Sequence, residues 1–303
     1  MNLQLSDRLV KAILFARGEA EGRLWLRSLP RRISHYARRW NLAPIEIAEG
    51  GAMSCCVFCI TIDQREVVLK IPFDAVSGRL ESRSLARWSE AGASPRVLAC
   101  APGSGVFLMS RVRPGTTAFP TGHADDSERL CDLIARMSSP HLRPMRSLKP
   151  LDAVNGMRLE WAVDRFKDPG YQEQLDQLSG AMALAATLLS TTDPVQIIHG
   201  DLQAKNILVG PEGRWEAIDP FTCRGDVNAE AALWAAPLDS SCSIEERIAQ
   251  LARCPALQED RLRAWCYVYA VLEYRAYIPS TADRMRAFTI PLDPGDLSAS
   301  LGR

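Results

Sequence analysis

Three polar side chains in the second half of the chain have the types and the spacing of a phosphoryl-transfer site. Asp201 and Asn206 lie in one polar loop between two apolar runs. A later turn sequence, Gly-Pro-Glu-Gly at 210–213, predicts a β-hairpin that returns Asp219 to the side of Asn206. A carboxylate that accepts a proton, with an amide and a second carboxylate aimed at the same point, suits magnesium-dependent transfer of a phosphoryl group to a hydroxyl. The alternative is a turn in which Asp201 and Asn206 only bond their own backbone.

The loop pattern also resembles that of a known family. His-Gly-Asp-Leu-x-x-x-Asn at 199–206, followed by Ile-Asp-Pro at 218–220, is similar to the catalytic and metal-binding loops of aminoglycoside phosphotransferases, which are relatives of protein kinases. The resemblance implies that Asp201 orients the substrate hydroxyl and accepts its proton. It also implies that Asn206 and Asp219 hold Mg²⁺ against the triphosphate of ATP or GTP.

Three other residues of this loop need separate interpretation. His199 is expected to be a structural histidine rather than a base, because a satisfied scaffold histidine is the commoner case. Gln203 stands where histidine is frequent in the family. Lys205 either reaches the γ-phosphate or points into solvent, and the sequence leaves both roles open.

Nucleotide-binding residues are expected in the first third of the chain. Lys70 lies inside an apolar strand and therefore needs an anionic partner, because burial of an unpaired ammonium is costly. Glu81, in the next predicted helix, can be that partner, and such a pair holds the α- and β-phosphates in kinases. The loop that contains Gly50 and Gly51 can lay backbone N–H groups over phosphates, although a plain hairpin turn has the same sequence.

A break in the pattern at Pro114-Gly115 follows the next apolar strand. In a kinase-like chain this is the hinge between lobes. Backbone groups of Ser110 and Val112 would then meet the edge of the adenine ring. Met109 would line the pocket behind the ring or fill the core, and the sequence does not separate these two roles.

Stretches outside the catalytic loops resemble the streptomycin 6-phosphotransferase branch, the aminoglycoside and hydroxyurea resistance kinases. They are Trp25–Trp40, Lys70, Glu81 with Leu85, Met109–Gly115 and Arg261–Ala270. The resemblance implies that the acceptor is streptomycin, phosphorylated on its 6-hydroxyl, with antibiotic resistance as the result. One alternative is another hydroxylated small molecule, such as hydroxyurea or a metabolite. A nucleotide-binding pseudokinase is disfavoured, since every catalytic residue type is present.

The expected acceptor residues are acidic, because streptomycin carries guanidinium groups and carboxylates accept two parallel hydrogen bonds from them. Asp226 and Glu230, just past the metal loop, and Glu273, on a late helix, are the candidates. The alternative is that all three are exposed charges of helices and loops. The chain reads Gly-Asp-Val-Asn-Ala-Glu at 225–230, where the family tends to show Gly-Asp-x-x-Tyr-Asp, which would fit a shifted or different acceptor.

The predicted elements place these residues in a kinase-like α+β fold, with a small antiparallel sheet lobe and a larger, mainly helical lobe. We expect N-terminal helices in 1–44, a nucleotide-binding lobe in 45–112 and a helical lobe with the catalytic loop and acceptor site in 113–303. Strands are predicted at 45–48, 55–62, 66–71, 96–100 and 106–110. Helices are predicted at 6–16, 77–91, 126–137, 171–190, 243–254 and 257–277, and a further helix is predicted to begin at Pro30.

The composition excludes several other classes of function. Lysine plus arginine equals aspartate plus glutamate at 36 each in 303 residues, so no global field attracts nucleic acid or an acidic membrane. No apolar run reaches the roughly 18 residues of a membrane span. Nine scattered cysteines indicate reduced thiols, and the Cys-Cys-x-x-Cys run at 55–59 lacks the second ligand pair of a zinc site. We expect a cytoplasmic monomer or weak dimer whose partner is a small-molecule substrate.

Overall fold

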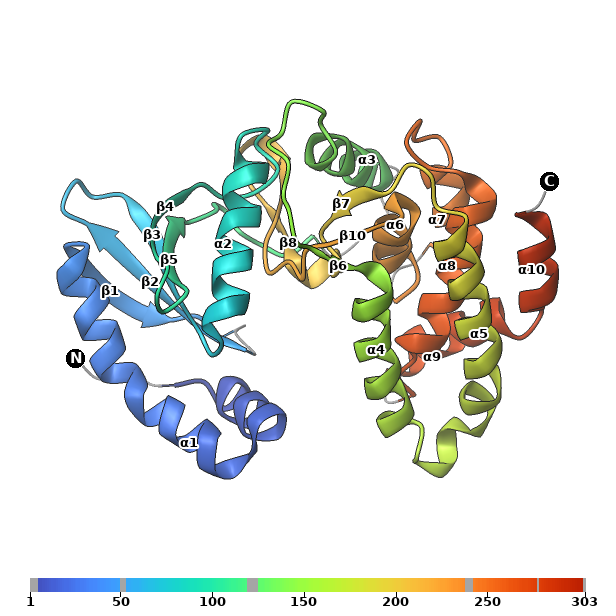
Figure 1. Ribbon diagram of the computed structural model, residues 1–303, viewed down its shortest axis with the longest axis horizontal. Helices are drawn as coiled ribbons and strands as arrows, with labels where there is room; N and C mark the ends of the chain where they lie inside the picture. Colours follow the sequence, from blue (N-terminus) through green and yellow to red (C-terminus); the bar gives the residue numbers. More distant parts are fainter. Residues whose placement is uncertain (1–4, 50–52, 119–124, 238–241, 277, 302–303) are drawn as a thin grey trace. The chain divides into compact units, whose positions relative to one another are not determined.

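The computed structural model describes residues 5–49, 53–118, 125–237, 242–276 and 278–301 (Figure 1). The chain divides into two compact units. The first consists of residues 1–90 and 94–115, and the second of residues 91–93 and 116–303. Each unit has its own core and is described by itself.

The first unit is built on a five-stranded antiparallel sheet. Its strands are β1 (Leu42–Ile47), β2 (Ser54–Thr61), β3 (Glu66–Pro72), β4 (Val97–Ala101) and β5 (Val106–Ser110), in the order β1-β2-β3-β5-β4. Side chains alternate between the two faces of a strand, so Val67, Leu69 and Ile71 pack on one side while Val68 packs on the other. Lys70 shares the face of Val68, which is the face that α2 (Ala75–Ser89) covers (Figure 1).

Helix α1 (Asp7–Arg39) covers the opposite face of this sheet and is not a separate N-terminal segment. Ser6 caps it as predicted, and Gly18 interrupts it with a positive φ of 73°. The predicted helix start at Pro30 is wrong, because Pro30 lies inside the helix. Buried residues on both sides of the proline, among them Trp25 and Ile33, keep the helix on the sheet and offset the roughly 3 kcal/mol that an internal proline costs.

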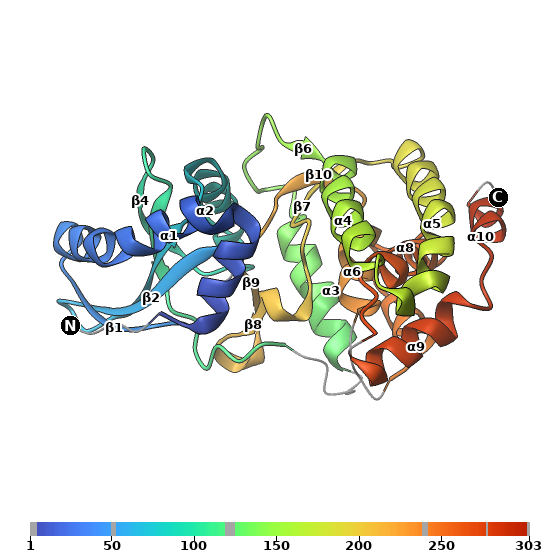
Figure 2. The ribbon, with the colours of Figure 1, turned by 90° about the horizontal axis from the view of Figure 1, so that it is seen from below.

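The second unit is mainly helical. Its helices are α3 (Asp125–Met137), α4 (Leu151–Arg165), α5 (Gln172–Ser190), α6 (Val227–Ala235), α7 (Ile244–Leu251), α8 (Glu259–Leu272), α9 (Pro279–Thr289) and α10 (Pro294–Ser300). Helix α8 is the centre of this unit, since it contacts α5, α6, α7, α9 and α10 and is buried along its second half (Figure 1, Figure 2). The helix predicted at 243–254 is present as α7 and begins with a capping box formed by Ser243 and Glu246.

Two small sheets carry the functional loops of the second unit. Strands β7 (Gln196–Ile198) and β6 (Lys149–Pro150) flank β10 (Cys223–Gly225), and β8 (Ile207–Val209) pairs with β9 (Trp215–Ala217) in the predicted antiparallel hairpin. Four helices had no counterpart in the predictions, namely α4, α6, α9 and α10. The prolines at 279 and 294 begin helices instead of marking an irregular tail, because the first helical turn needs no N–H donor at these positions.

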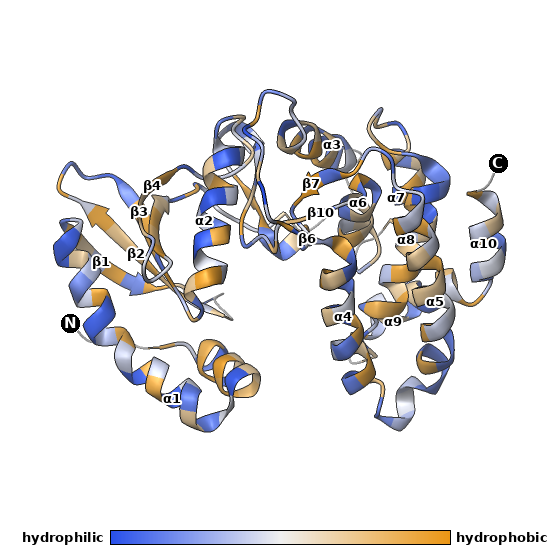
Figure 3. Ribbon diagram, viewed as in Figure 1, coloured by the Kyte–Doolittle hydropathy of each residue, from blue (hydrophilic) through white to orange (hydrophobic). Residues whose placement is uncertain are grey.

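The hydropathy of the chain follows this architecture. The strands of the larger sheet are predominantly apolar, whereas α2, α4 and α5 alternate between apolar and polar residues, as expected for helices with one face on a core (Figure 3). Among the described residues, no helix combines the length and the apolar character that crossing a bilayer requires.

Candidate active site

The loop after β7 holds Asp201 with both carboxylate oxygens engaged. Oδ1 accepts hydrogen bonds from Arg158 Nη2 at 2.8 Å and from Gln203 Nε2 at 2.9 Å, and Oδ2 accepts one from Asn206 Nδ2 at 2.8 Å. Asp201 is 6% exposed. Lys205 is half exposed, and its Nζ lies 3.8 Å from Asp201 Oδ2. The carboxylate is therefore held in one orientation by neighbours on both sides.

The β8–β9 hairpin brings Asp219 next to Asn206, as predicted. Ile218 N–H donates to the Asn206 carbonyl at 2.9 Å, so the residue before Asp219 is bonded directly to the Asn206 backbone. Asn206 Nδ2 also donates to the Asp201 carbonyl at 2.8 Å. This orientation of the amide leaves its oxygen as the atom that it can offer to a cation. Asp219 itself has a φ of 58°, a left-handed conformation that aspartate tolerates better than most residues.

Glu230, from α6, bonds the backbone of the loop just before Asp201. Its two oxygens accept the N–H groups of His199 at 2.9 Å and of Gly200 at 2.7 Å. The side chain is 2% exposed, and burial raises its pKa to about 7, against the opposing effect of these two N–H donors. The carboxylate thus fixes the backbone of the two residues that precede Asp201.

His199 links the loop of Asp201 to the segment that follows the β8–β9 hairpin. Its Nε2 lies 2.9 Å from the Ile218 carbonyl, which can only accept, so this nitrogen carries the proton. Its Nδ1 accepts the Asp201 N–H at 3.2 Å. Burial lowers the pKa of His199 to about 4, so the ring is neutral at physiological pH. A neutral imidazole with both nitrogens bonded to the backbone has the structural role that the sequence predicted.

The raised pKa of Glu230 leads to a prediction about stability. In the unfolded chain a glutamate titrates near pH 4.5, so between that pH and about 7 the folded state binds the extra proton, and this group's contribution to stability falls as the pH rises. His199, with its lowered pKa, contributes the opposite slope between about pH 4 and 6.5. We expect Glu230→Gln, which removes the first contribution, to gain in Tm relative to the unmodified protein as the pH rises from about 5 to about 8. Thermal unfolding of both proteins across this range is the measurement, and a constant difference in Tm would contradict it.

Arg158, on α4, bonds Asp201 directly and was not among the residues that the sequence analysis named. It is 1% exposed, and in addition to Asp201 it contacts the Gly200 carbonyl at 2.7 Å and Glu273 Oε1 at 2.8 Å. Burial alone would lower the pKa of Arg158, but Asp201 and Glu273 outweigh it and raise that pKa above its usual value. An arginine in the interior of an amphipathic helix is the only signal in the sequence, and it does not name its partners.

In the first unit, Lys70 and Glu81 form the predicted pair. Lys70 Nζ lies 2.6 Å from Glu81 Oε1, and the two side chains are 3% and 11% exposed. The alternation along β3 points Lys70 toward α2, on which Glu81 lies in the second turn. The pairing offsets the cost of burying the ammonium.

The expected adenine contacts have different outcomes. Ser110 N–H already donates to the Arg96 carbonyl at 2.9 Å, so this donor is engaged within the sheet and is not offered to a base. Met109 and Val112 are buried in the first unit, and Met109 packs in the small cluster with Val68 and Phe107, which is core filling. Gly50 and Gly51 lie outside the described residues.

Comparison with models of known families matches most of this chain to one of them. The model of the aminoglycoside/hydroxyurea antibiotic resistance kinase family matches residues 39–276, which include the catalytic loop, the hairpin and the Lys70–Glu81 pair. The chain belongs to this family. It is therefore a phosphotransferase that acts on a hydroxyl group of a small molecule, as the sequence predicted.

Two curated proteins show the spread of activity within this kinase family. The chain is 26% identical to a hydroxyurea phosphotransferase from Kitasatospora aureofaciens, over 82% of this chain and 73% of that protein. It is 27% identical to a streptomycin 6-kinase from Streptomyces griseus, over 78% and 75%. Among solved structures, choline kinase LicA from Streptococcus pneumoniae matches with a TM-score of 0.63 at 11% identity, over 87% of this chain and 99% of that one. These similarities confirm the predicted protein-kinase-like α+β fold.

The acidic residues expected to meet the acceptor have other partners in this kinase. Asp226 is 2% exposed, caps α6, and accepts hydrogen bonds from Arg261 and from Trp265 Nε1 at 2.8 Å. Glu230 holds the catalytic loop, and Glu273 accepts from Arg158 and, at 3.0 Å, from Arg275. All three are buried carboxylates with hydrogen-bond partners within the chain, whereas the alternative considered from the sequence was an exposed charge.

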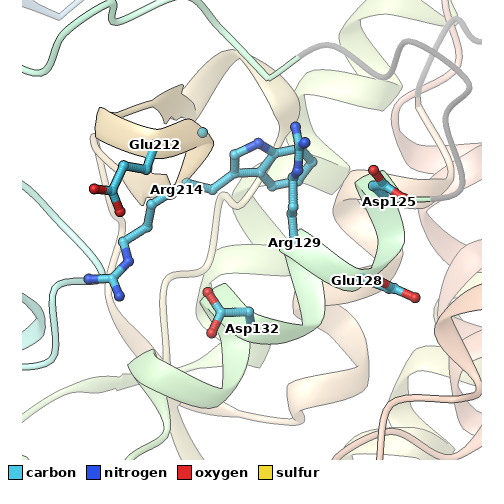
Figure 4. A pocket seen from close by; sticks show the side chains of 8 residues that line it. Asp125, Glu128, Arg129, Asp132, Glu212 and Arg214 are labelled. Carbon is cyan, nitrogen blue, oxygen red and sulfur yellow. The ribbon is translucent and has the colours of Figure 1, made fainter.

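A charged hollow of about 370 Å³ lies on the surface of the second unit (Figure 4), and none of the residues that bond Asp201 lines it. It is lined by Asp125, Glu128, Arg129 and Asp132 of α3 and by residues 212–215 of the β8–β9 hairpin. Carboxylates and guanidinium groups both line it, so its charges do not favour either an anionic or a cationic ligand. No cluster of three histidine, cysteine or acidic residues with the geometry of a metal site occurs among the described residues, the cysteines at 55–59 included.

Proposed function

We propose that this kinase transfers the γ-phosphoryl group of ATP or GTP to a hydroxyl of a cationic aminoglycoside, streptomycin at its 6-hydroxyl. The observation that carries the chemistry is the fixed carboxylate of Asp201 beside Asn206 and the hairpin residue Asp219. In this proposal Asp201 orients the acceptor hydroxyl and takes its proton as the oxygen attacks. The protein works in the cytoplasm, where the nucleotide is.

The donor set around Asp201 fits Mg²⁺. An amide oxygen and a carboxylate are hard ligands, and the hydrogen bond from Asn206 Nδ2 to Asp201 turns the amide oxygen of Asn206 outward. Asn206 and Asp219 would hold the ion, which neutralises charge on the phosphate oxygens. In the first unit, the Lys70 ammonium would contact the α- and β-phosphates, with Glu81 keeping it in place.

The distribution of charge favours a cationic acceptor. The unit that contains Asp201 has 19 lysines and arginines and 26 acidic residues, a net charge of −7, while the unit that contains Lys70 has 17 and 10, a net charge of +7. Overall neutrality therefore hides two opposite fields. A negative catalytic unit attracts a polycationic aminoglycoside, and a positive one attracts a triphosphate.

A second candidate is hydroxyurea or another small hydroxylated acceptor. It is favoured by the internal use of Asp226, Glu230 and Glu273, because no carboxylate of that set is left to receive the guanidinium groups of streptomycin. The identities to the hydroxyurea and streptomycin relatives, 26% and 27%, do not separate the two acceptors.

Steady-state kinetics with a panel of acceptors tests the proposal. The purified protein with Mg²⁺ and ATP, then GTP, is offered streptomycin, other aminoglycosides and hydroxyurea, and phosphorylated products are identified by mass spectrometry. We expect transfer to streptomycin with a kcat/KM that falls as ionic strength rises, because the attraction between opposite charges is screened. Transfer to hydroxyurea alone would select the second candidate, and transfer to neither would refute both.

A further inference from the structure

Arg158 connects three segments that are far apart in the sequence. Its Nη2 bonds both Asp201 Oδ1 and the Gly200 carbonyl, and its Nη1 bonds Glu273 Oε1 at the end of α8. The rigid fork of the guanidinium suits this task, since it presents parallel donors in one plane. Lysine has the same charge but lacks this geometry.

Burial of Arg158 costs free energy, which suggests that the residue has a function beyond the fold. Its Nε is buried without an acceptor among the described residues, which adds to the cost of burying the charge. Buried ion pairs are weak evidence for stability, because the loss of hydration often exceeds the attraction between the charges. A role in the fold alone therefore explains this residue poorly.

Arg158 fixes both the side chain and the backbone at the catalytic position. Gly200 has a φ of 78°, and a Cβ at that position would lie 3.1 Å from Cys223 Sγ, so the loop makes a tight left-handed turn just before Asp201. Arg158 bonds the carbonyl of this glycine and the carboxylate of the next residue. The same group thereby sets the peptide plane and the direction of Asp201 Oδ1.

We propose that Arg158 is a positioning residue that orients Asp201 for proton transfer, and that Glu273 orients Arg158 in turn. The proposal rests on the role of Asp201 as the proton acceptor. Glu273 was expected from the sequence to contact the acceptor, and in this proposal it acts on Asp201 only through Arg158. Phe221 lies beside this group, with its ring centre 5.9 Å from the Arg158 guanidinium carbon.

A double-mutant cycle separates positioning from general damage. Arg158→Lys keeps the charge, and so the fold, but loses the fork. We expect it to lower kcat about ten- to a hundredfold with the nucleotide KM nearly unchanged. In the Asp201→Asn background it should have no further effect, because the group that it positions is gone. If Arg158→Lys lowers the residual rate of Asp201→Asn by the same factor as in the unmodified protein, the positioning role is refuted.

A matched control lies on the same helix. Arg165 of α4 donates to the Leu272 carbonyl at 2.5 Å, and its guanidinium carbon lies 5.3 Å from the centre of the Phe166 ring. Arg165→Lys makes the same chemical change on the same helix and should leave kcat within about twofold. Glu273→Gln should lower kcat less than Arg158→Lys does and should also lose its effect in Asp201→Asn. An additive effect there would refute its part in the proposal.

A readout independent of activity separates this proposal from the proposed function. Amide hydrogen exchange in residues 199–203 should be faster in Arg158→Lys than in the unmodified protein and in Arg165→Lys. Unchanged exchange there would overturn the positioning role, whichever acceptor is used. Faster exchange together with an inactive unmodified protein would leave Arg158 as the anchor of the loop and refute only the proposed function.

Discussion

Asp201→Asn should lower turnover by about 10² to 10⁴ while leaving nucleotide affinity nearly unchanged. The substitution keeps the size of the side chain and an oxygen that can accept from Arg158 and Gln203, and it loses the oxygen that accepts from Asn206 Nδ2. What is lost is the group that accepts the proton. Initial rates at saturating acceptor, with nucleotide binding measured by titration, provide the check.

The control for this experiment is Asp164→Asn. Asp164 is an exposed carboxylate on α4 that pairs with Lys167 at the surface. Its replacement should change turnover by less than about twofold, since surface pairs contribute little. Undiminished turnover in Asp201→Asn would mean that the proton leaves by another route and that the catalytic residue has been misassigned.

Asp219→Asn should abolish activity that depends on magnesium. A hard divalent ion loses its anionic ligand, and the stabilisation of several kcal/mol that it supplies corresponds to about a thousandfold in rate or more. Rates measured as a function of Mg²⁺ concentration test this expectation.

Lys70→Ala should have a different effect on the kinetics, because it chiefly weakens the binding of the triphosphate and so raises the nucleotide KM.

Glu212→Gln is the matched control within the same hairpin. Glu212 is an exposed carboxylate in the turn between β8 and β9, and its loss should leave the magnesium dependence unchanged. If Asp219→Asn keeps a normal magnesium dependence, the hairpin does not bring a metal ligand to the site.

The prediction of the β8–β9 hairpin succeeded because its signals are local. A polar loop between apolar runs, a turn sequence and a carboxylate directly after it determine the β8–β9 hairpin within about twenty residues. The Lys70–Glu81 pair is similar, since strand alternation and helix periodicity over eleven positions were enough to bring the two side chains together. Pro30 shows the limit of local rules, because packing of the flanking apolar residues overrode the tendency of proline to start a helix.

By itself, the sequence determined the family and the hairpin that brings Asp219 beside Asn206, because the motif residues and the turn are near neighbours in the chain. Only the tertiary structure decided what surrounds Asp201. Arg158 and Glu273 lie 43 and 72 residues away along the chain, and Glu230 was expected to face the substrate and instead faces two backbone N–H groups. The sequence shows that a residue is acidic or basic, but not whether its side chain contacts solvent, ligand or backbone. Only the packing of α4, α6 and α8 around the loop decides which of these it contacts.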